Sequence, residues 1–167
     1  QKSFEQEYGE LKDFHVLALL PAYLERKGSS LVSMAAHFIE KSSSGHSGFY
    51  LYNHDELFQK LKLLSKDSKK VLLLGVTFAL LDLAEKKEEF PQSENLIVME
   101  TGGMKGRRKE MIREEVHQIL KESFHVDNIH SEYGMTELMS QAYSKGEGKY
   151  TLPLSMRVML RDVNDPL

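Results

Sequence analysis

Residues 71–106, VLLLGVTFALLDLAEKKEEFPQSENLIVMETGGMKG, form the stretch that decides the fold class. The stretch opens with a short, continuous apolar run that ends at Gly75, and such a run predicts a buried strand. Val76–Glu88 then predicts a helix, and a second apolar run over Leu96–Met99 predicts another buried strand. Because strands that are buried on both faces lack polar alternation, this strand–helix–strand unit is typical of a parallel sheet covered by helices.

The same alternation of strands and helices continues on both sides of this stretch. We therefore expect an α/β fold with a mostly parallel sheet and helices on both of its faces, formed by residues 1–167 as a single domain. The further predicted strands are Phe14–Leu20, Phe49–Tyr52, Asn128–Ser131 and Ser155–Leu160. The further predicted helices run from Ser29 or Ser30 to about Lys41, from Asn53 or Asp55 through the stripe Leu57–Leu64, and over Arg107–Phe124 and Glu137–Tyr143.

The amino-acid composition excludes several classes of protein. Hydrophobic residues make up 41% and charged residues 28% of the chain, which is ordinary for a globular domain and excludes a collagen-like or disordered chain. The net charge of -3 offers no bulk attraction to nucleic acid, so we expect no nucleic-acid partner. No apolar run approaches the roughly 20 residues of a membrane span. The absence of cysteine excludes disulfides, thiolate metal sites and a cysteine nucleophile within these residues, and we expect a cytoplasmic location.

Two loops are predicted beyond the carboxyl ends of strands, where open parallel sheets bind their ligands. The first is Thr101–Gly106, within ETGGMKGRRKE. Gly102 and Gly103 allow backbone N–H groups to come close to a ligand. The loop is not a Walker loop, and it lacks the first glycine of the dinucleotide fingerprint. A tight strand-to-helix turn followed by a solvated basic segment explains the same residues equally well.

The second loop is SEYGMTE, residues 131–137. Tyr133 offers a flat ring on which a purine can stack, and Gly134 leaves room beside the backbone. Thr136 offers a hydroxyl group to a phosphate oxygen, and Glu137 offers a carboxylate to Mg²⁺. The structural alternative is that Thr136 caps a helix, Glu137 lies in its first turn and Tyr133 belongs to the core, and the residue types alone favour this alternative.

The string Tyr-Gly-Met-Thr-Glu resembles the Y-G-x-T-E signature of the adenylate-forming enzymes, the superfamily of acyl-CoA synthetases, luciferases and peptide-synthetase adenylation domains. In that superfamily a Gly-Gly or Gly-Ala pair lies about thirty residues upstream, and Gly102–Gly103 takes the same position here. The wider sequence is similar to one branch, the acyl-protein synthetases related to the fatty-acid ligase of bacterial bioluminescence. The stretches that carry this similarity, between about Phe14 and Pro166, are LLPAYLERKGSSLVSM, GFYLY, LLGVTFALLDLAE, ETGGMKGRR and IHSEYGMTELMSQAYS.

The resemblance implies an ATP-dependent, AMP-forming acyl ligase with ATP and Mg²⁺ as cofactors. A carboxylic-acid substrate attacks the α-phosphate of ATP, giving acyl-AMP and pyrophosphate, and the acyl group then passes to a thiol or a protein acceptor. By position, Tyr133 would stack on adenine, and the implied catalytic residues are Thr136, on the phosphate, and Glu137, on Mg²⁺. The implied nucleotide-binding residues are Gly102, Gly103, Glu132, Tyr133, Gly134, Met135 and Thr136.

The sequence also departs from this superfamily. Ser131 stands where many relatives have a Gln, Asn or Asp that reaches the adenine amino group. The SSSGHSG stretch, residues 42–48, does not match the triphosphate loop in sequence or position, and we interpret it as an ordinary loop. That triphosphate loop belongs upstream of these residues, and the ribose-binding Asp and catalytic Lys belong downstream. Because the chain starts at Gln1 and stops in a turn-rich sequence, we expect a central slice of a longer ligase that is inactive by itself.

Two other functions stay open. One is a nicotinamide-type nucleotide-binding domain that uses TGGMKG, and the other is a non-catalytic relative of the fold. The nicotinamide hypothesis requires an acidic residue about twenty positions on at a strand end, whereas Glu122 lies within a predicted helix. His117, His125 and His130 could meet in space, but scattered core or solvated histidines are the simpler interpretation.

Overall fold

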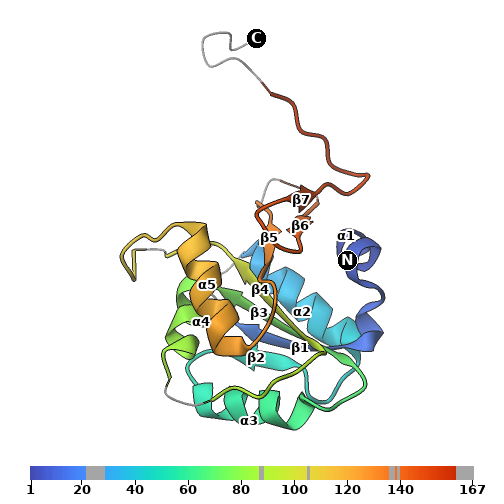
Figure 1. Cartoon of the computed structure of the whole chain (residues 1–167). Helices are drawn as coiled ribbons and strands as arrows, with labels where there is room; N and C mark the ends of the chain where they lie inside the picture. Colours follow the sequence, from blue (N-terminus) through green and yellow to red (C-terminus); the bar gives the residue numbers. More distant parts are fainter. Residues whose placement is uncertain (22–28, 87–88, 105, 136–137, 139, 161–167) are drawn as a thin grey trace.

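The computed structural model describes residues 1–21, 29–86, 89–104, 106–135, 138 and 140–160. They form a seven-stranded mixed sheet with the strand order β2-β1-β3-β4-β5-β6-β7, flanked by helices (Figure 1). In chain order the elements are α1 (Lys2–Tyr8), the 3-10 helix η1 (Leu11–Asp13), β1 (Phe14–Leu19), α2 (Ser30–Ser42), β2 (Gly48–Tyr50), α3 (His54–Leu64), β3 (Lys70–Val76), α4 (Thr77–Ala84), β4 (Leu96–Thr101), α5 (Arg113–Phe124), β5 (His130–Tyr133), β6 (Ala142–Ser144) and β7 (Tyr150–Thr151).

The first five strands are parallel, which confirms the expected α/β class with a mostly parallel sheet. β1 lies between β2 and β3, and β3 pairs with β4 from Val71↔Leu96 to Val76↔Thr101. Every residue of β1 is buried, as the continuous apolar run Phe14–Leu20 predicted. β6 and β7 complete the sheet in the antiparallel sense.

Helices cover both faces of the sheet, as expected (Figure 1). On one face α1 packs on α2, where the ring centroids of Phe4 and Phe38 are 4.8 Å apart. On the other face α4 packs on α5, and α3 is joined to α5 through ring contacts of Phe58, Phe90 and Phe124, one edge-on and one tilted. The helices divide between the two faces because crossover connections between parallel strands are right-handed. The chain moves across the sheet in one direction from β1 to β2 and in the opposite direction from β2 through β3 and β4 to β5, so the connecting helices lie on opposite faces.

The helix predicted over Arg107–Phe124 begins only at Arg113. The segment before it is irregular and is tied to α4 by Arg108, whose guanidinium donates to Asp82 (Nε–Oδ1 2.8 Å) and to Glu85 (Nη1–Oε1 2.6 Å). These two ion pairs hold Arg108 beside α4. The first turn of α5 carries Glu114 and Glu115, and negative charge suits a helix N-terminus better than the basic residues 107–109 would.

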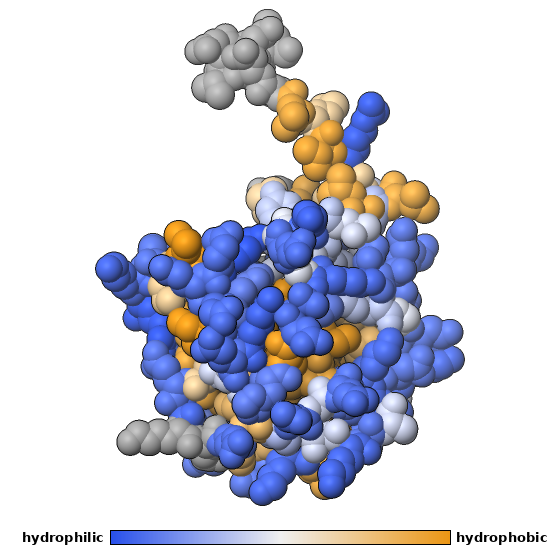
Figure 2. Space-filling model, viewed as in Figure 1, coloured by the Kyte–Doolittle hydropathy of each residue, from blue (hydrophilic) through white to orange (hydrophobic). Residues whose placement is uncertain are grey.

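Two predicted elements at the end of the chain are wrong. The helix predicted over Glu137–Tyr143 is contradicted at its end, where Ala142 and Tyr143 belong to strand β6. This strand pairs with β5 from Ser131↔Ser144 to Tyr133↔Ala142 and buries Tyr143. Ser155–Leu160, expected as a strand, forms none. Val158, Met159 and Leu160 are exposed, Leu160 by 96%, and Figure 2 shows this stretch standing away from the body of the molecule. The alternation of apolar and polar residues was present, but no neighbouring strand within the described ranges pairs with it.

Candidate functional site

The carboxyl ends of β4 and β5 lie side by side. The two strands are parallel, with Met99 opposite His130 and Glu100 opposite Ser131. The two predicted ligand loops therefore leave the same edge of the sheet from adjacent strands. Their bases are joined by a hydrogen bond from the Thr101 hydroxyl to Glu132 (Oγ1–Oε2 2.7 Å). The sequence interpretation required this adjacency, and the strand pairing provides it.

A cleft of about 180 Å³ opens beside the glycine turn. Gly102 and Gly103 form part of its wall, both with positive φ (93° and 149°), a conformation that favours glycine. Among the described residues, no atom outside the two chain neighbours of Gly103 lies within 4 Å of a Cβ placed there, so a ligand can reach its backbone. The other described residues that line the cleft are Thr77, Glu100, Met104, Glu110, Met111, Arg113, Val116 and His117.

Two buried side chains form the floor of this cleft. Glu100 accepts a hydrogen bond from the Thr77 hydroxyl (Oγ1–Oε2 2.8 Å), and His117 Nε2 lies 3.7 Å from Glu100 Oε1. Burial opposes ionisation of Glu100, but interactions with His117, Ser131 and Thr77, together with the charge of Arg113, leave its pKa below the ordinary value. The cleft therefore carries a fixed negative charge at neutral pH.

The pKa of Glu132 is shifted in the opposite direction from that of Glu100, although the two residues lie on adjacent strands. Burial raises the pKa of Glu132, the bond from Thr101 lowers it in part, and the charge of Glu100 raises it further. Its carboxyl group also explains Gly134, because a Cβ at position 134 would lie 2.5 Å from Glu132 Oε1 and 3.2 Å from Gln141 Cγ. A side chain at position 134 would therefore have to displace the carboxyl group of Glu132.

Tyr133 is 46% exposed and does not line the cleft. Its ring lies 6.1 Å from that of Tyr150 in an edge-on arrangement, and the Arg113 guanidinium lies 5.5 Å from the Tyr150 ring centroid. Because Arg113 lines the cleft, the contact of Tyr133 with the wall of the cleft is indirect and runs through Tyr150 and Arg113. Met135 is exposed, and the predicted residues Thr136 and Glu137 lie outside the described residues.

The structure adds residues that the motif analysis did not select. Thr77, Glu100, Thr101 and His117 surround the base of the glycine turn. Glu100 and Thr101 directly precede Gly102, so their position at a strand end was a usable signal. Thr77 and His117 come from other elements, and nothing in their local sequence indicated this contact. In the part of the chain that the structure describes, no three His, Asp or Glu side chains are grouped so that they could hold a metal ion.

Comparisons with protein-family models, with curated proteins and with solved structures found no match. Within the described residues, none of the helices has the length and apolarity to cross a membrane.

Replacing Thr101 by valine is expected to lower the free energy of unfolding by about 1–3 kcal/mol, because the buried carboxyl group of Glu132 loses its hydroxyl donor. Valine keeps the shape of threonine, so packing changes little. Urea unfolding at neutral pH measures the loss. Thr101→Ser keeps the hydroxyl and should lie close to the wild type, and equal stability of the valine variant would contradict the bond.

Replacing Glu132 by glutamine is expected to change how stability depends on pH. A carboxyl group with a raised pKa holds its proton more tightly in the folded chain than in the unfolded chain. Its contribution to the stability of the fold is therefore fully present below the pKa of the unfolded chain, 4.5, and is lost as the pH rises through the pKa of the folded chain. The variant should therefore gain stability relative to the wild type as the pH rises above about 4.5. Glu114→Gln, at an exposed position of α5, serves as the control, and parallel curves for both variants would contradict the shift.

Proposed function

We propose that this chain contributes the adenine-binding part of an ATP-dependent, AMP-forming acyl ligase. The observation that carries the proposal is the parallel pairing of β4 with β5, since it brings the glycine turn and the Tyr-Gly loop of the resemblance to one edge of the sheet. Substrate sites of open parallel sheets lie at this edge. A carboxylic acid and a thiol or protein acceptor are the proposed substrates. The absence of cysteine favours the cytoplasm as the compartment.

The described residues fit a nucleotide in three respects. Tyr133 presents a half-exposed ring for stacking. Gly102 and Gly103 expose backbone in a cleft of about 180 Å³ that is open to solvent. Arg113 places a positive charge between this cleft and Tyr133.

In the proposed reaction these residues bind and orient the nucleotide while a carboxylate oxygen attacks the α-phosphate and pyrophosphate leaves. Catalysis of this kind depends mainly on positioning and on stabilising charge. Thr136 is assigned to the phosphate by the motif. Glu137 is assigned to Mg²⁺, which binds through one or two carboxylates together with substrate phosphates and neutralises their charge.

A nicotinamide-type domain is the alternative, and the fold favours it less. The acidic residue at the required distance, Glu122, lies inside α5 and its side chain is hydrogen-bonded to Gln118 on the same helix (2.5 Å). A nicotinamide dinucleotide site requires that residue at a strand end, where it can reach the ribose.

The test is the binding of AMP to the protein at its full natural length. We expect Tyr133→Ala to weaken AMP binding by about 5- to 150-fold, because aromatic stacking on a base contributes about 1–3 kcal/mol. Tyr133→Phe keeps the ring and should bind normally. Tyr52→Ala removes an exposed ring elsewhere and is the matched control. Isothermal titration calorimetry measures the change, and equal affinity of the alanine variant and the wild type would contradict the adenine site.

A further inference from the structure

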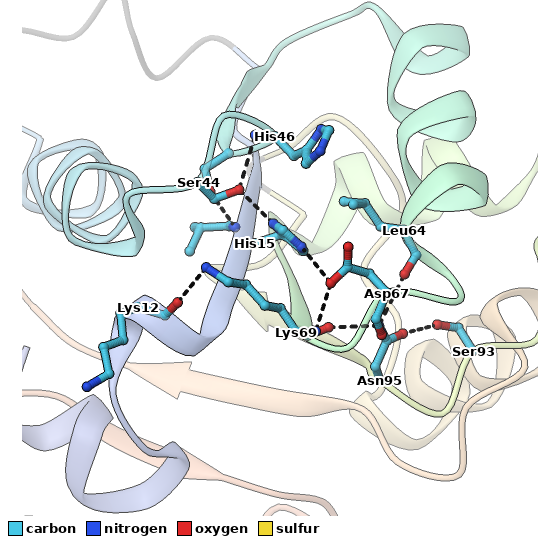
Figure 3. A network of polar contacts seen from close by, with 11 residues as sticks. Lys12, His15, Ser44, His46, Leu64, Asp67, Lys69, Ser93 and Asn95 are labelled. Carbon is cyan, nitrogen blue, oxygen red and sulfur yellow. Dashed lines mark hydrogen bonds and ion pairs between the residues drawn. The ribbon is translucent and has the colours of Figure 1, made fainter.

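A second polar cluster lies at the opposite, amino-terminal edge of the sheet (Figure 3). His15 is the second residue of β1, the loop of residues 43–47 connects α2 to β2, and Asp67 lies in the turn between α3 and β3. Because β1, β2 and β3 are parallel neighbours, the segments that enter them meet at one edge. The topology thus brings a histidine, a serine-rich loop and a carboxylate together, far from the glycine cleft.

The three side chains are arranged in a line with the histidine in the middle. His15 Nδ1 lies 2.6 Å from Ser44 Oγ, at hydrogen-bond distance. His15 Nε2 lies 3.3 Å from Asp67 Oδ1, an ion-pair distance whose geometry is not that of a hydrogen bond (Figure 3). A nucleophile within about 2.6–3.2 Å of a base, with the base oriented by a third group, is the arrangement that activates a serine hydroxyl. In most serine hydrolases Nε2 of the histidine faces the serine and Nδ1 faces the carboxylate, whereas in His15 the two nitrogens are reversed. The chemistry requires only that one nitrogen faces the hydroxyl and the other faces the carboxylate.

Asp67 is held rigidly in its place. Its Oδ1 accepts a hydrogen bond from the Lys69 N–H (2.8 Å), and this bond, followed by the interaction with His15, keeps its pKa below the ordinary value. The turn itself is fixed by the Asn95 amide, which donates to the carbonyl groups of Leu64 (3.1 Å), Asp67 (2.9 Å) and Lys69 (2.8 Å). The carboxylate of Asp67 thus lies at ion-pair distance from the ring of His15.

Ser44 is the serine of the loop that faces this histidine. Ser47 accepts from the Val16 N–H (2.9 Å) and bonds to Ser42, which itself donates to the Ile39 carbonyl. These two hydroxyl groups therefore fix the loop to β1 and α2. Ser44 Oγ instead bonds to His15 and accepts from the His46 N–H (3.1 Å), a bond that stabilises negative charge on this oxygen.

The loop also leaves room and a donor for an acyl group. Within the described residues, the backbone N–H of Gly45 has no hydrogen-bond partner, and no atom apart from its chain neighbours lies within 4 Å of a Cβ placed there. The N–H that follows a nucleophilic serine is one of the usual donors to the oxyanion in acyl transfer. Ser44 is half-buried rather than enclosed, whereas His15 is 5% exposed.

We propose that Ser44, His15 and Asp67 form a second reactive site, in which Ser44 accepts the acyl group of an activated ester. The Ser44 oxygen forms a bond to the carbonyl carbon, its proton passes to His15 Nδ1, and the ester C–O bond breaks as that proton moves to the leaving oxygen. Water then hydrolyses the acyl-serine, which restores Ser44 and releases the carboxylic acid. This site is independent of the proposed ligase function.

The first test is labelling with a fluorophosphonate, which forms an Oγ–P bond and releases fluoride while His15 takes the proton. Mass spectrometry of the digested, folded chain should find the adduct on Ser44. Asp67→Asn keeps an acceptor for the Lys69 N–H but leaves His15 without its charge partner. It should slow labelling on the order of 10²-fold. Ser43→Gly removes a neighbouring hydroxyl in the same loop and should label normally. An adduct missing from Ser44, or unaffected by Asp67→Asn, overturns the proposal.

The second test uses the absence of cysteine, because Ser44→Cys then carries the only thiol of the chain. An ordinary thiol titrates near a pKa of about 8.5, and a histidine–carboxylate pair lowers that value. Alkylation by iodoacetamide at about pH 6.5 should be at least about tenfold faster for Ser44→Cys than for Ser43→Cys, measured from the mass shift. The other titratable groups near His15 are His46, with ring centroids 5.4 Å apart, and Lys69, whose ammonium donates to the Lys12 carbonyl. Identical pH profiles of the two variants would overturn the proposal.

Discussion

Replacement of Phe4 by alanine is expected to lower the free energy of unfolding by about 3–5 kcal/mol, as for other fully buried phenylalanines. The Phe4 side chain is 0% exposed and joins α1 to the sheet and to α2. Its ring centroid lies 4.8 Å from Tyr8, 5.4 Å from Phe14, 4.8 Å from Phe38 and 5.8 Å from Tyr143. Removing it opens a cavity among four rings that belong to different elements. A domain that is stable by about 5–15 kcal/mol loses a large part of its stability in this way.

Chemical denaturation followed by circular dichroism measures the effect. Tyr52→Ala is the matched control, because that ring is 67% exposed, and a change within about 0.5 kcal/mol is expected for it. A loss below about 1 kcal/mol for Phe4→Ala would mean that α1 is not part of the core. The result decides whether the first eight residues belong to the folding unit.

Replacement of Glu137 by glutamine is expected to slow adenylation by about 10²–10³-fold, or about 2.7–4 kcal/mol, in the protein at its full natural length. The variant keeps the shape of the side chain and removes the charge that is proposed to hold Mg²⁺. Lost stabilisation of charge at the phosphate should appear in the rate rather than in stability. Pyrophosphate exchange at saturating ATP measures this rate.

The structural alternative for Glu137 predicts a different result. A carboxylate in the first turn of a helix contributes about 0.3–1 kcal/mol to stability and has little direct effect on turnover. The helix that this alternative required does not extend over the described residues, since Ala142–Ser144 is a strand. Glu114→Gln, an exposed substitution in the first turn of α5, is the control. Unchanged exchange by Glu137→Gln with a slightly lower melting temperature would contradict the metal assignment.

The loops at the two edges of the sheet carry polar side chains of different kinds. The carboxyl edge carries Glu100 and Glu132, whose pKa values are shifted in opposite directions, next to the glycine turn. The amino edge carries His15, with Ser44 and Asp67 on either side of its ring. The adenylation and labelling experiments examine each edge separately, so the failure of one proposal leaves the other testable.

The sequence by itself determined the inner strands and their class of sheet. Strands that are covered on both faces must be apolar throughout, so Phe14–Leu19 and Lys70–Val76 could be located within one or two residues from composition alone. It also predicted two loops at strand ends, from the glycine pair Gly102–Gly103 and from the Tyr-Gly string at Tyr133. The observed strand order places the strands that precede these loops next to each other.

The tertiary structure decided what local sequence leaves open. Helix α1 is short, and it is fixed by contacts between Phe4 and Tyr143, at the other end of the chain. Ala142–Ser144 became a strand because the exposed side of β5 offered backbone partners, whereas Ser155–Leu160 had the right pattern and no described partner. The pairing of His15 with Ser44 and Asp67 also joins distant segments. Such contacts depend on which segments the fold brings together, and no local propensity of the residues determines them.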